Sequence, residues 1–147
     1  MEIYSLANYK LTLTTNDEVL KATFGESLTI GGQGKKIGSI KINQTNAPYS
    51  IQSFATGGYY YDKSLDRHGD VTINLNQLAE EIAKFKTLLN LYYTGDYNGF
   101  TIVLTTNENV KVAECIDCLM TGVPSQDFGT TAGNQDWTFS SGQITFI

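Results

Sequence analysis

The sequence of 147 residues contains only one histidine and two cysteines, so it has few of the nitrogen and sulfur groups on which nucleophilic catalysis and transition-metal binding usually depend. It is also poor in charge, with 17% charged residues against an average near 25%. No cluster of basic residues is longer than Lys35-Lys36, and the net charge is −5. Because an acidic chain repels phosphate backbones, nucleic-acid recognition is disfavoured.

Long hydrophobic runs are missing as well. The first fifteen residues carry neither a basic start nor an apolar stretch of signal-peptide length. No stretch approaches the length of a membrane helix, so we expect no membrane anchor. We therefore expect synthesis and assembly in the cytoplasm, where cysteines stay free thiols.

What is present favours one folded domain with surfaces that other proteins cover. A hydrophobic content of 41% over 147 residues is enough to bury a core. The chain shows no repeat and no linker, so residues 1–147 are predicted to form a single domain. Low charge together with nine tyrosines and fourteen glycines is typical of surfaces that other subunits cover.

The strongest structural pattern is a strand–helix–strand unit over residues 69–104. Apolar residues first alternate from Val71 to Leu75, as in a half-buried strand. The spacing then changes to three and four residues, which predicts a helix that ends before Gly95. Its expected buried face comprises Leu78, Ile82, Phe85, Leu88, Leu89 and Tyr92, with Glu80, Glu81, Lys84 and Lys86 largely on the other side. Alternation resumes at Phe100.

The rest of the chain reads as strands. They are expected at residues 9–15, 19–24, 37–43, 110–119, 136–140 and 144–146, with a glycine-rich connection at 31–34 and a surface loop at 121–134. The predicted fold class is mainly β: an antiparallel sandwich or barrel capped by one amphipathic helix.

Residues 44–68 form a distinct segment within this domain. Aromatic and apolar residues occur on both sides of its alternation, and a structureless loop of this length is unusual in a compact domain. One interpretation is an extended hairpin arm whose surface is buried by a neighbouring subunit. The other is an ordinary edge hairpin with exposed tyrosines. In the first case the contact residues would be Tyr49, Ile51, Phe54, Tyr59, Tyr60 and Tyr61.

Three groups of residues have the composition of chemical sites. Cys115 and Cys118 have metal or redox spacing, but zinc needs two further ligands, and residues three apart in a strand face opposite sides unless a bulge intervenes. The favoured interpretation is that both cysteines are small buried residues of a strand.

Residues 31–36, GGQGKK, lack the first glycine and the hydroxyl residue of a phosphate loop, so a solvated turn is expected.

The third group surrounds the single histidine. Ser64, Asp66 and His68 are close in sequence, but a nucleophilic triad is defined by spatial geometry. Asp62, Asp66 and Asp70 could pair or bind a cation, although such runs are more often a solvated rim. We therefore expect no catalytic residue, no metal and no cofactor.

From residue 59 onward the chain resembles phage tail tube proteins, particularly the structural-protein family of contractile-tailed phages. The residues that carry this resemblance are GDVTINLNQ at 69–77 before the helix, the proline-to-aromatic connection at 124–128, and GNQDWTF at 133–139. The family often has Ser-Pro-Ser/Thr-Asn at the helix start, where this chain has Gln77-Leu78-Ala79-Glu80.

The resemblance implies a self-assembling subunit of hexameric rings that stack into a tube inside a contractile sheath. Its partners would be further copies of itself and the sheath, baseplate and tape-measure proteins, and DNA would pass through the lumen without specific binding. The location would be the tail of the virion. Two alternatives stay open: another tail, baseplate or secretion-system component of the same fold, or a small enzyme or ligand-binding domain with a polar pocket near His68.

Overall fold

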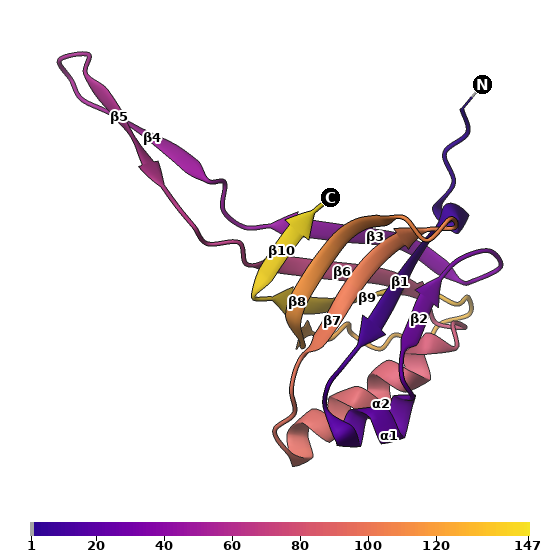
Figure 1. Ribbon diagram of the computed structural model, residues 1–147. Coiled ribbons are helices and arrows are strands. Elements are labelled where there is room, and N and C mark those ends of the chain that lie inside the picture. The colour runs from indigo at the N-terminus through magenta and orange to yellow at the C-terminus, as the bar shows by residue number, and fades with distance from the viewer. Residues whose placement is uncertain (1) are drawn as a thin grey trace.

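Within residues 2–147, the computed structural model contains ten strands, two α-helices and one short 3-10 turn (Figure 1). The strands are β1 (Tyr9–Thr14), β2 (Leu28–Gly31), β3 (Ile37–Gln44), β4 (Tyr49–Ser53), β5 (Tyr59–Lys63), β6 (Gly69–Asn76), β7 (Phe100–Thr106), β8 (Lys111–Gly122), β9 (Asn134–Ser141) and β10 (Gln143–Phe146). The helices are α1 (Glu18–Phe24) and α2 (Glu81–Thr94), and the 3-10 turn η1 spans Leu6–Asn8.

The main sheet is antiparallel and folds into two layers that share strand β8. Its order is β2-β1-β7-β8-β9-β6-β3, and β10 pairs with β8 outside this path. The first half of β8 pairs with β7 and β10, and its last residues pair with β9. Asp117 lies between the two halves with a positive φ of 55°. The bulge at Asp117 thus marks the point where β8 passes from one layer to the other.

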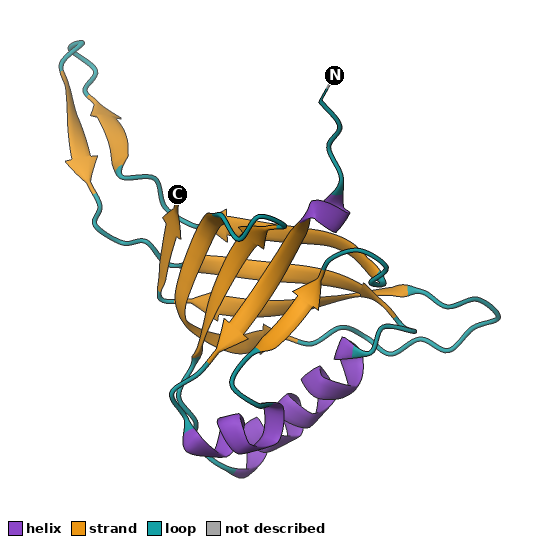
Figure 2. Cartoon of the chain, turned by 45° about the vertical axis from the view of Figure 1, so that its right-hand side comes forward, coloured by secondary structure: helices purple, strands orange, loops and turns teal. Residues whose placement is uncertain are grey.

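The predicted strand–helix–strand unit is confirmed. Strand β6 pairs with β3 on one side and β9 on the other, and its odd-numbered residues from Gly69 to Leu75 are buried. Helix α2 then places Phe85 5.6 Å, between ring centroids, from both Trp137 and Phe139 of β9. Helices α1 and α2 lie side by side below the strands (Figure 2). The mainly β sandwich that the sequence predicts is therefore the fold observed.

One predicted strand is wrong: residues 19–24 lie in helix α1. Asp17 caps this helix, and its carboxylate accepts hydrogen bonds from the backbone N–H groups of Val19 and Leu20. The β-branched residues favour a strand, but this cap satisfies the first N–H groups of a helix. The strand that returns beside β1 is β2, with Ile30 opposite Leu11. The fold therefore has two α-helices where one was expected.

The start of helix α2 differs from the prediction as well. Leu78 precedes the helix and is 65% exposed. It lies in a tight turn in which the Leu78 N–H donates a hydrogen bond to the side chain of Asn76. Glu81, expected on the polar face, is buried. The turn between β2 and β3, with Lys35 4.0 Å from Glu80, lies against this end of the helix. The buried residues of α2 are Glu81, Ile82, Phe85 and Leu88.

The segment at 44–68 forms an arm that projects away from the sandwich, as both views show (Figures 1 and 2). Its strands β4 and β5 form a separate two-stranded sheet. Every residue of the two strands is exposed. The sequence prediction of an extended hairpin is thus confirmed in its shape.

Candidate assembly surface

The arm has two faces of different character. In the register of the hairpin, Ile51 lies opposite Tyr61, and Ser53 lies opposite Tyr59. Because side chains alternate along a strand, Tyr49, Ile51, Tyr59 and Tyr61 share one face. The other face carries polar residues along its length, Ser50, Gln52 and Asp62, with Phe54 and Tyr60 near the tip. One side of the arm is therefore aromatic and the other is mostly polar.

All six predicted contact residues are exposed large side chains. Their exposed fractions run from 48% for Tyr60 to 68% for Tyr59. Tyr59 and Tyr61 pack edge to face with ring centroids 6.2 Å apart, and Phe54 lies 5.7 Å from Tyr60. The Lys63 ammonium lies 5.8 Å from the Tyr49 ring. These contacts stay within the arm and leave most of the aromatic surface in water.

A hairpin of this kind is marginal by itself. Isolated two-stranded sheets need a third strand or a packed face to be stable in water. Within residues 2–147, β4 and β5 pair with each other and with no third strand. The arm therefore presents both an unburied aromatic face and open strand edges that another chain can cover.

The root of the arm is held by hydrogen bonds between its two sides. Thr45 N–H donates to the His68 carbonyl at 3.0 Å, and Ser64 N–H donates to the Pro48 carbonyl at 2.7 Å. The Asn46 amide donates to the Asp66 carboxylate at 2.8 Å. The adjoining segment is tied to β10, since Ile144 N–H donates to the Arg67 carbonyl at 2.8 Å. The arm thus leaves the sandwich from a defined base.

The histidine cluster at this root does not form a nucleophilic triad. His68 Nδ1 lies 2.5 Å from Asp66 Oδ2, and this hydrogen bond holds the pKa of the Asp66 carboxyl below its ordinary value. Ser64 Oγ instead accepts a bond from the Asp66 backbone N–H at 3.2 Å. The cluster is an exposed turn in which Asp66 joins the two sides of the arm root.

The three aspartates near the arm are not brought together. Asp62 lies in β5 opposite Ser50, and Asp70 in β6 accepts a bond from Ser140 Oγ at 2.8 Å. Across residues 2–147, no three His, Cys, Asp or Glu side chains are grouped so that they could hold a metal ion.

Both cysteines face the core. Cys115 and Cys118 are fully buried, although an uninterrupted strand would turn them to opposite sides. The bulge at Asp117 inserts one residue between them and restores the same face, so the Cys118 thiol donates to the Cys115 carbonyl at 3.5 Å. Burial raises the pKa of Cys115 to about 12 and that of Cys118 to about 11. They are buried thiols that resist ionisation.

The glycine-rich stretch at 31–36 is a turn followed by strand β3, as predicted. Gly31, Gly32 and Gly34 all have positive φ, which a side chain would disfavour.

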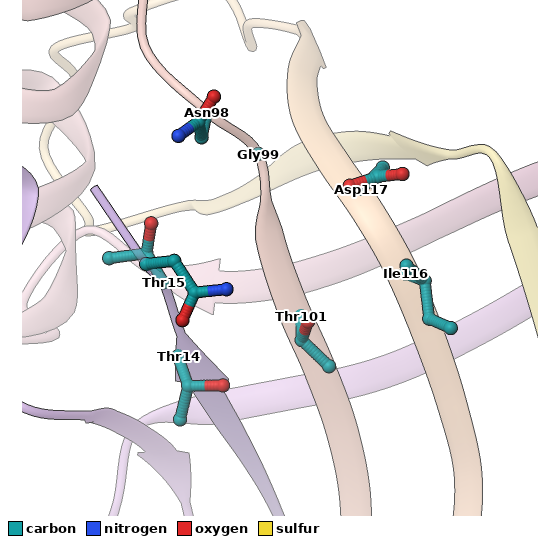
Figure 3. Close-up of a pocket in the computed structure, with 8 residues that line it drawn as sticks. Thr14, Thr15, Asn98, Gly99, Thr101, Ile116 and Asp117 are labelled. Atoms are coloured by element: carbon teal, nitrogen blue, oxygen red, sulfur yellow. The ribbon is translucent and has the colours of Figure 1, made fainter.

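A polar hollow of about 270 Å³ lies where β1, β7 and β8 meet (Figure 3). Its lining presents the hydroxyls of Thr14, Thr15 and Thr101, the amides of Asn16 and Asn98, and one carboxylate, Asp117 (Figure 3). These groups can hydrogen-bond water or a small polar molecule. Asp117 is the single titratable side chain of the lining, whereas acid–base catalysis ordinarily uses a pair of titratable groups with different pKa values.

A second exposed feature escaped the sequence analysis. Residues 123–133, the loop between β8 and β9, carry Phe128 with 88% of its surface exposed. Glycines and polar residues there predicted a surface loop, and Phe128 entered only as the aromatic end of the connection at 124–128. The side chain of Gln77 holds this loop in place through hydrogen bonds to Asp127 and Gly133. Sequence spacing cannot indicate such a contact, because Gln77 lies far from the loop in the sequence.

No helix within residues 2–147 has both the length and the apolar character required to cross a bilayer.

Several solved structures share this fold, among them chains of the anti-feeding prophage and of an extracellular contractile injection system. A chain of the anti-feeding prophage baseplate, solved by cryo-EM with six-fold symmetrisation, aligns with a TM-score of 0.64 at 8% identity, covering 100% of this chain and 96% of that chain. A chain of the anti-feeding prophage tube-terminating cap aligns with a TM-score of 0.58 at 13% identity, covering 99% and 91%. The fold is that of contractile injection system components. A chain of the extended PVC sheath–tube complex aligns at 0.56 with 9% identity, covering 99% and 93%.

The likeness establishes the fold and not a shared function, because the identities are 8–13%. No protein-family model and no curated protein sequence matches the chain. The tail-tube resemblance drawn from the sequence is nevertheless confirmed at the level of the fold, by a comparison that uses backbone geometry and spans nearly the whole chain.

Proposed function

We propose that this chain is a structural subunit that assembles with copies of itself into stacked rings of a tail or injection tube. The observation that carries the proposal is the arm formed by β4 and β5, whose aromatic face is exposed and whose strands pair with no other strand within residues 2–147. Burying apolar surface contributes about 25 cal/mol per Å², and aromatic residues dominate the stable centres of protein interfaces. A neighbouring subunit that covers the arm therefore stabilises both the hairpin and the assembly.

The shape of the molecule supports an open assembly. The arm projects far from the sandwich, so the surface that it reaches belongs to a different part of the neighbouring copy (Figure 1). Contacts between unlike surfaces generate rings when the rotation closes and filaments when it does not. Hexameric rings that stack axially would combine both outcomes.

The proposal extends to the partners and the place of action. A tube of this type would lie inside a sheath, join a baseplate and enclose a tape-measure protein in the tail of a virion, after assembly in the host cytoplasm. The net charge of −5 suits a lumen through which DNA passes without binding. The function would then be structural, with DNA conducted during infection.

A second candidate role is a cap or baseplate component, or a tube protein of an injection system outside phages. The observation in its favour is that the fold matches chains from structures of a baseplate, a tube-terminating cap and a sheath/tube terminator, as well as a sheath–tube complex. The two roles differ in the length of the product. A tube subunit polymerises without limit, whereas a cap or baseplate subunit stops at one ring.

Negative-stain electron microscopy of the purified full-length protein tests the proposal. We expect hollow tubes of uniform diameter; single rings would favour the second role. A variant that lacks residues 49–61, with the ends joined by a short glycine linker, is expected to fold and to stay monomeric. The Ser64–Pro48 backbone bond keeps those ends adjacent, so circular dichroism should report an intact sandwich. Tubes formed by this variant would contradict the role of the arm, and a wild-type protein that stays monomeric would contradict assembly itself.

A further inference from the structure

We propose that the loop at 123–133 is a second assembly element, whose Phe128 inserts into a pocket at the arm root of the next copy of this chain. The inference rests on the proposed self-assembly and adds a specific contact to it.

The loop is built to hold Phe128 outward. The Gln77 side chain joins its two sides, since its amide donates to the Asp127 carbonyl and its oxygen accepts from Gly133 N–H at 2.8 Å. The Gln77 backbone N–H also donates to the Gly133 carbonyl at 2.9 Å. Gln135, which is buried, donates through its amide to the Gln126 side chain at 3.1 Å. A held loop binds with less loss of conformational freedom than a mobile one.

Phe128 is hardly buried by the described residues of its own chain. With 88% of its surface exposed, it is the most exposed large hydrophobic residue in the described part of the chain. A side chain of this size gains about 1.5–3 kcal/mol when it is fully buried. The clamped loop therefore presents an unburied aromatic side chain at a defined position, as the arm does.

The root pocket provides a matching receptor. It has a volume of about 400 Å³ and is lined by Pro48 and Leu65 together with Lys63, Arg67 and Asp66. A cavity of about 150 Å³ is enough for a benzene ring, so a phenylalanine side chain fits. Leu65 is 83% exposed and supplies apolar surface at the mouth.

The charges of the pocket and of the loop are complementary. Lys63 and Arg67 outnumber the one carboxylate of the pocket, Asp66, which already bonds to His68 and Asn46. Asp127 directly precedes Phe128 in the loop. Within residues 2–147, none of Lys63, Arg67 and Asp127 forms a salt bridge. Docking Phe128 therefore brings an unpaired carboxylate to an unpaired cationic rim, which selects the partner and its orientation.

The two elements lie at opposite ends of one strand pair. The arm root joins β6 at Gly69, which lies opposite Ser141, and the loop joins β9 at Asn134, which lies opposite Asn76. Eight paired residues separate these ends by roughly 23 Å. Figure 2 shows the arm and the loop on opposite sides of the sandwich. A contact between them is possible only between different copies, and it is head-to-tail, as ring or tube growth requires.

Disulfide trapping in the full-length protein tests the contact. The variant with Leu65→Cys and Phe128→Cys, assembled and then treated with a mild oxidant, is expected to give a ladder of dimers, trimers and larger species on a non-reducing gel. The native Cys115 and Cys118 are buried and do not interfere. The matched control carries Leu65→Cys and Tyr93→Cys, since Tyr93 is 83% exposed but lies on helix α2. It is expected to give at most dimers.

The outcomes separate this inference from the proposed function. Rings or tubes in the microscope without a ladder, or an equal ladder from the Tyr93 control, would overturn the contact and leave assembly intact. An unmodified protein that forms no oligomer would overturn both.

Charge-reversal variants provide a second test of the contact, independent of disulfide trapping. Asp127→Arg should raise the concentration at which assembly begins at least about fivefold, and adding Arg67→Asp to the same chain should recover most of this loss. Failure of the second change to rescue the first would contradict the ion pairing.

Discussion

Gly99 lies directly against the backbone of Asp117: a Cβ on Gly99 would be 2.9 Å from the Asp117 carbonyl carbon and 3.0 Å from the Cys118 nitrogen. Strand β7 begins at Phe100, so this approach places the bulge of β8 tightly beside its neighbour. The bulge in turn faces Cys115 and Cys118 inward and leads β8 into the second layer. One close backbone contact therefore accompanies the main corner of the sandwich.

Replacing Gly99 with alanine is expected to lower the free energy of unfolding by about 1–3 kcal/mol, because backbone atoms must shift to admit the methyl group. Urea denaturation followed by tryptophan fluorescence measures the change, since Trp137 is fully buried. Gly129→Ala is the matched control, because a Cβ at Gly129 meets no atom within 4 Å. Equal stability of the two variants would show that the close approach is not restrictive.

Stability should fall as the pH rises above about 9. The pKa values of Cys115 and Cys118 are raised to about 12 and about 11, so the unfolded chain releases thiol protons before the folded chain does. The stabilising contribution is complete below the ordinary thiol pKa and is lost as the pH rises toward the folded values. For two thiols this amounts to roughly 2 kcal/mol over the first pH unit above 9.

The comparison that isolates this effect is a double variant with alanine at both cysteines. It removes a small amount of packing at every pH, and its unfolding free energy should fall less steeply between pH 9 and pH 10. A slope identical to that of the native chain would assign the pH dependence to other groups. In the native chain at pH 8, a thiol reagent should react only after denaturant is added, because the thiols are buried and protonated.

Asp17→Ala should destabilise the fold by about 1–2 kcal/mol, because Asp17 caps α1 and also holds the segment before β7. One carboxylate oxygen accepts from Val19 and Leu20, and the other accepts from the Asn98 backbone N–H at 3.1 Å. Thermal unfolding followed by circular dichroism measures the loss. Asn16→Ala, at an exposed neighbouring position, provides the control, and an equal effect of the two changes would mean that the cap contributes little.

The two faces of the arm should contribute unequally to assembly. Ile51→Ala together with Tyr61→Ala removes an opposed pair from the aromatic face, and each change in a buried interface centre would weaken binding by more than about 1 kcal/mol. The concentration needed for tubes should therefore rise at least about tenfold. Sedimentation at graded protein concentrations provides the measurement.

The matched control changes the polar face of the same hairpin, with Ser50→Ala and Gln52→Ala. It should assemble nearly as the native protein does. If the control is impaired as strongly as the aromatic variant, the aromatic face is not the contact surface, and the arm would act through its strand edges instead.

Local sequence patterns were sufficient to predict those elements whose own residues show the period of a strand or a helix. Alternation from Val71 to Leu75 and the helical spacing through Phe85 and Leu88 predicted β6 and α2, since burial on one face repeats with the period of the element. For residues 44–68 local patterns left two interpretations, an extended arm or an edge hairpin, because aromatic and apolar residues on both sides of the alternation suit either one. The structure shows the arm (Figure 1). The segment at 19–24 failed, since a cap at Asp17 outweighs the β preference of its side chains.

The sequence by itself determined the mainly β class, the central unit and the absence of a familiar catalytic motif, because these depend on residue type and short-range spacing. Only the tertiary structure decided that β8 bends at Asp117 to turn both cysteines inward, and that Gln77 clamps a loop more than forty residues away. Both depend on contacts between segments distant in sequence, and no local period encodes such contacts. The arm root and the Phe128 loop likewise became opposite ends of one molecule only when β6 paired with β9.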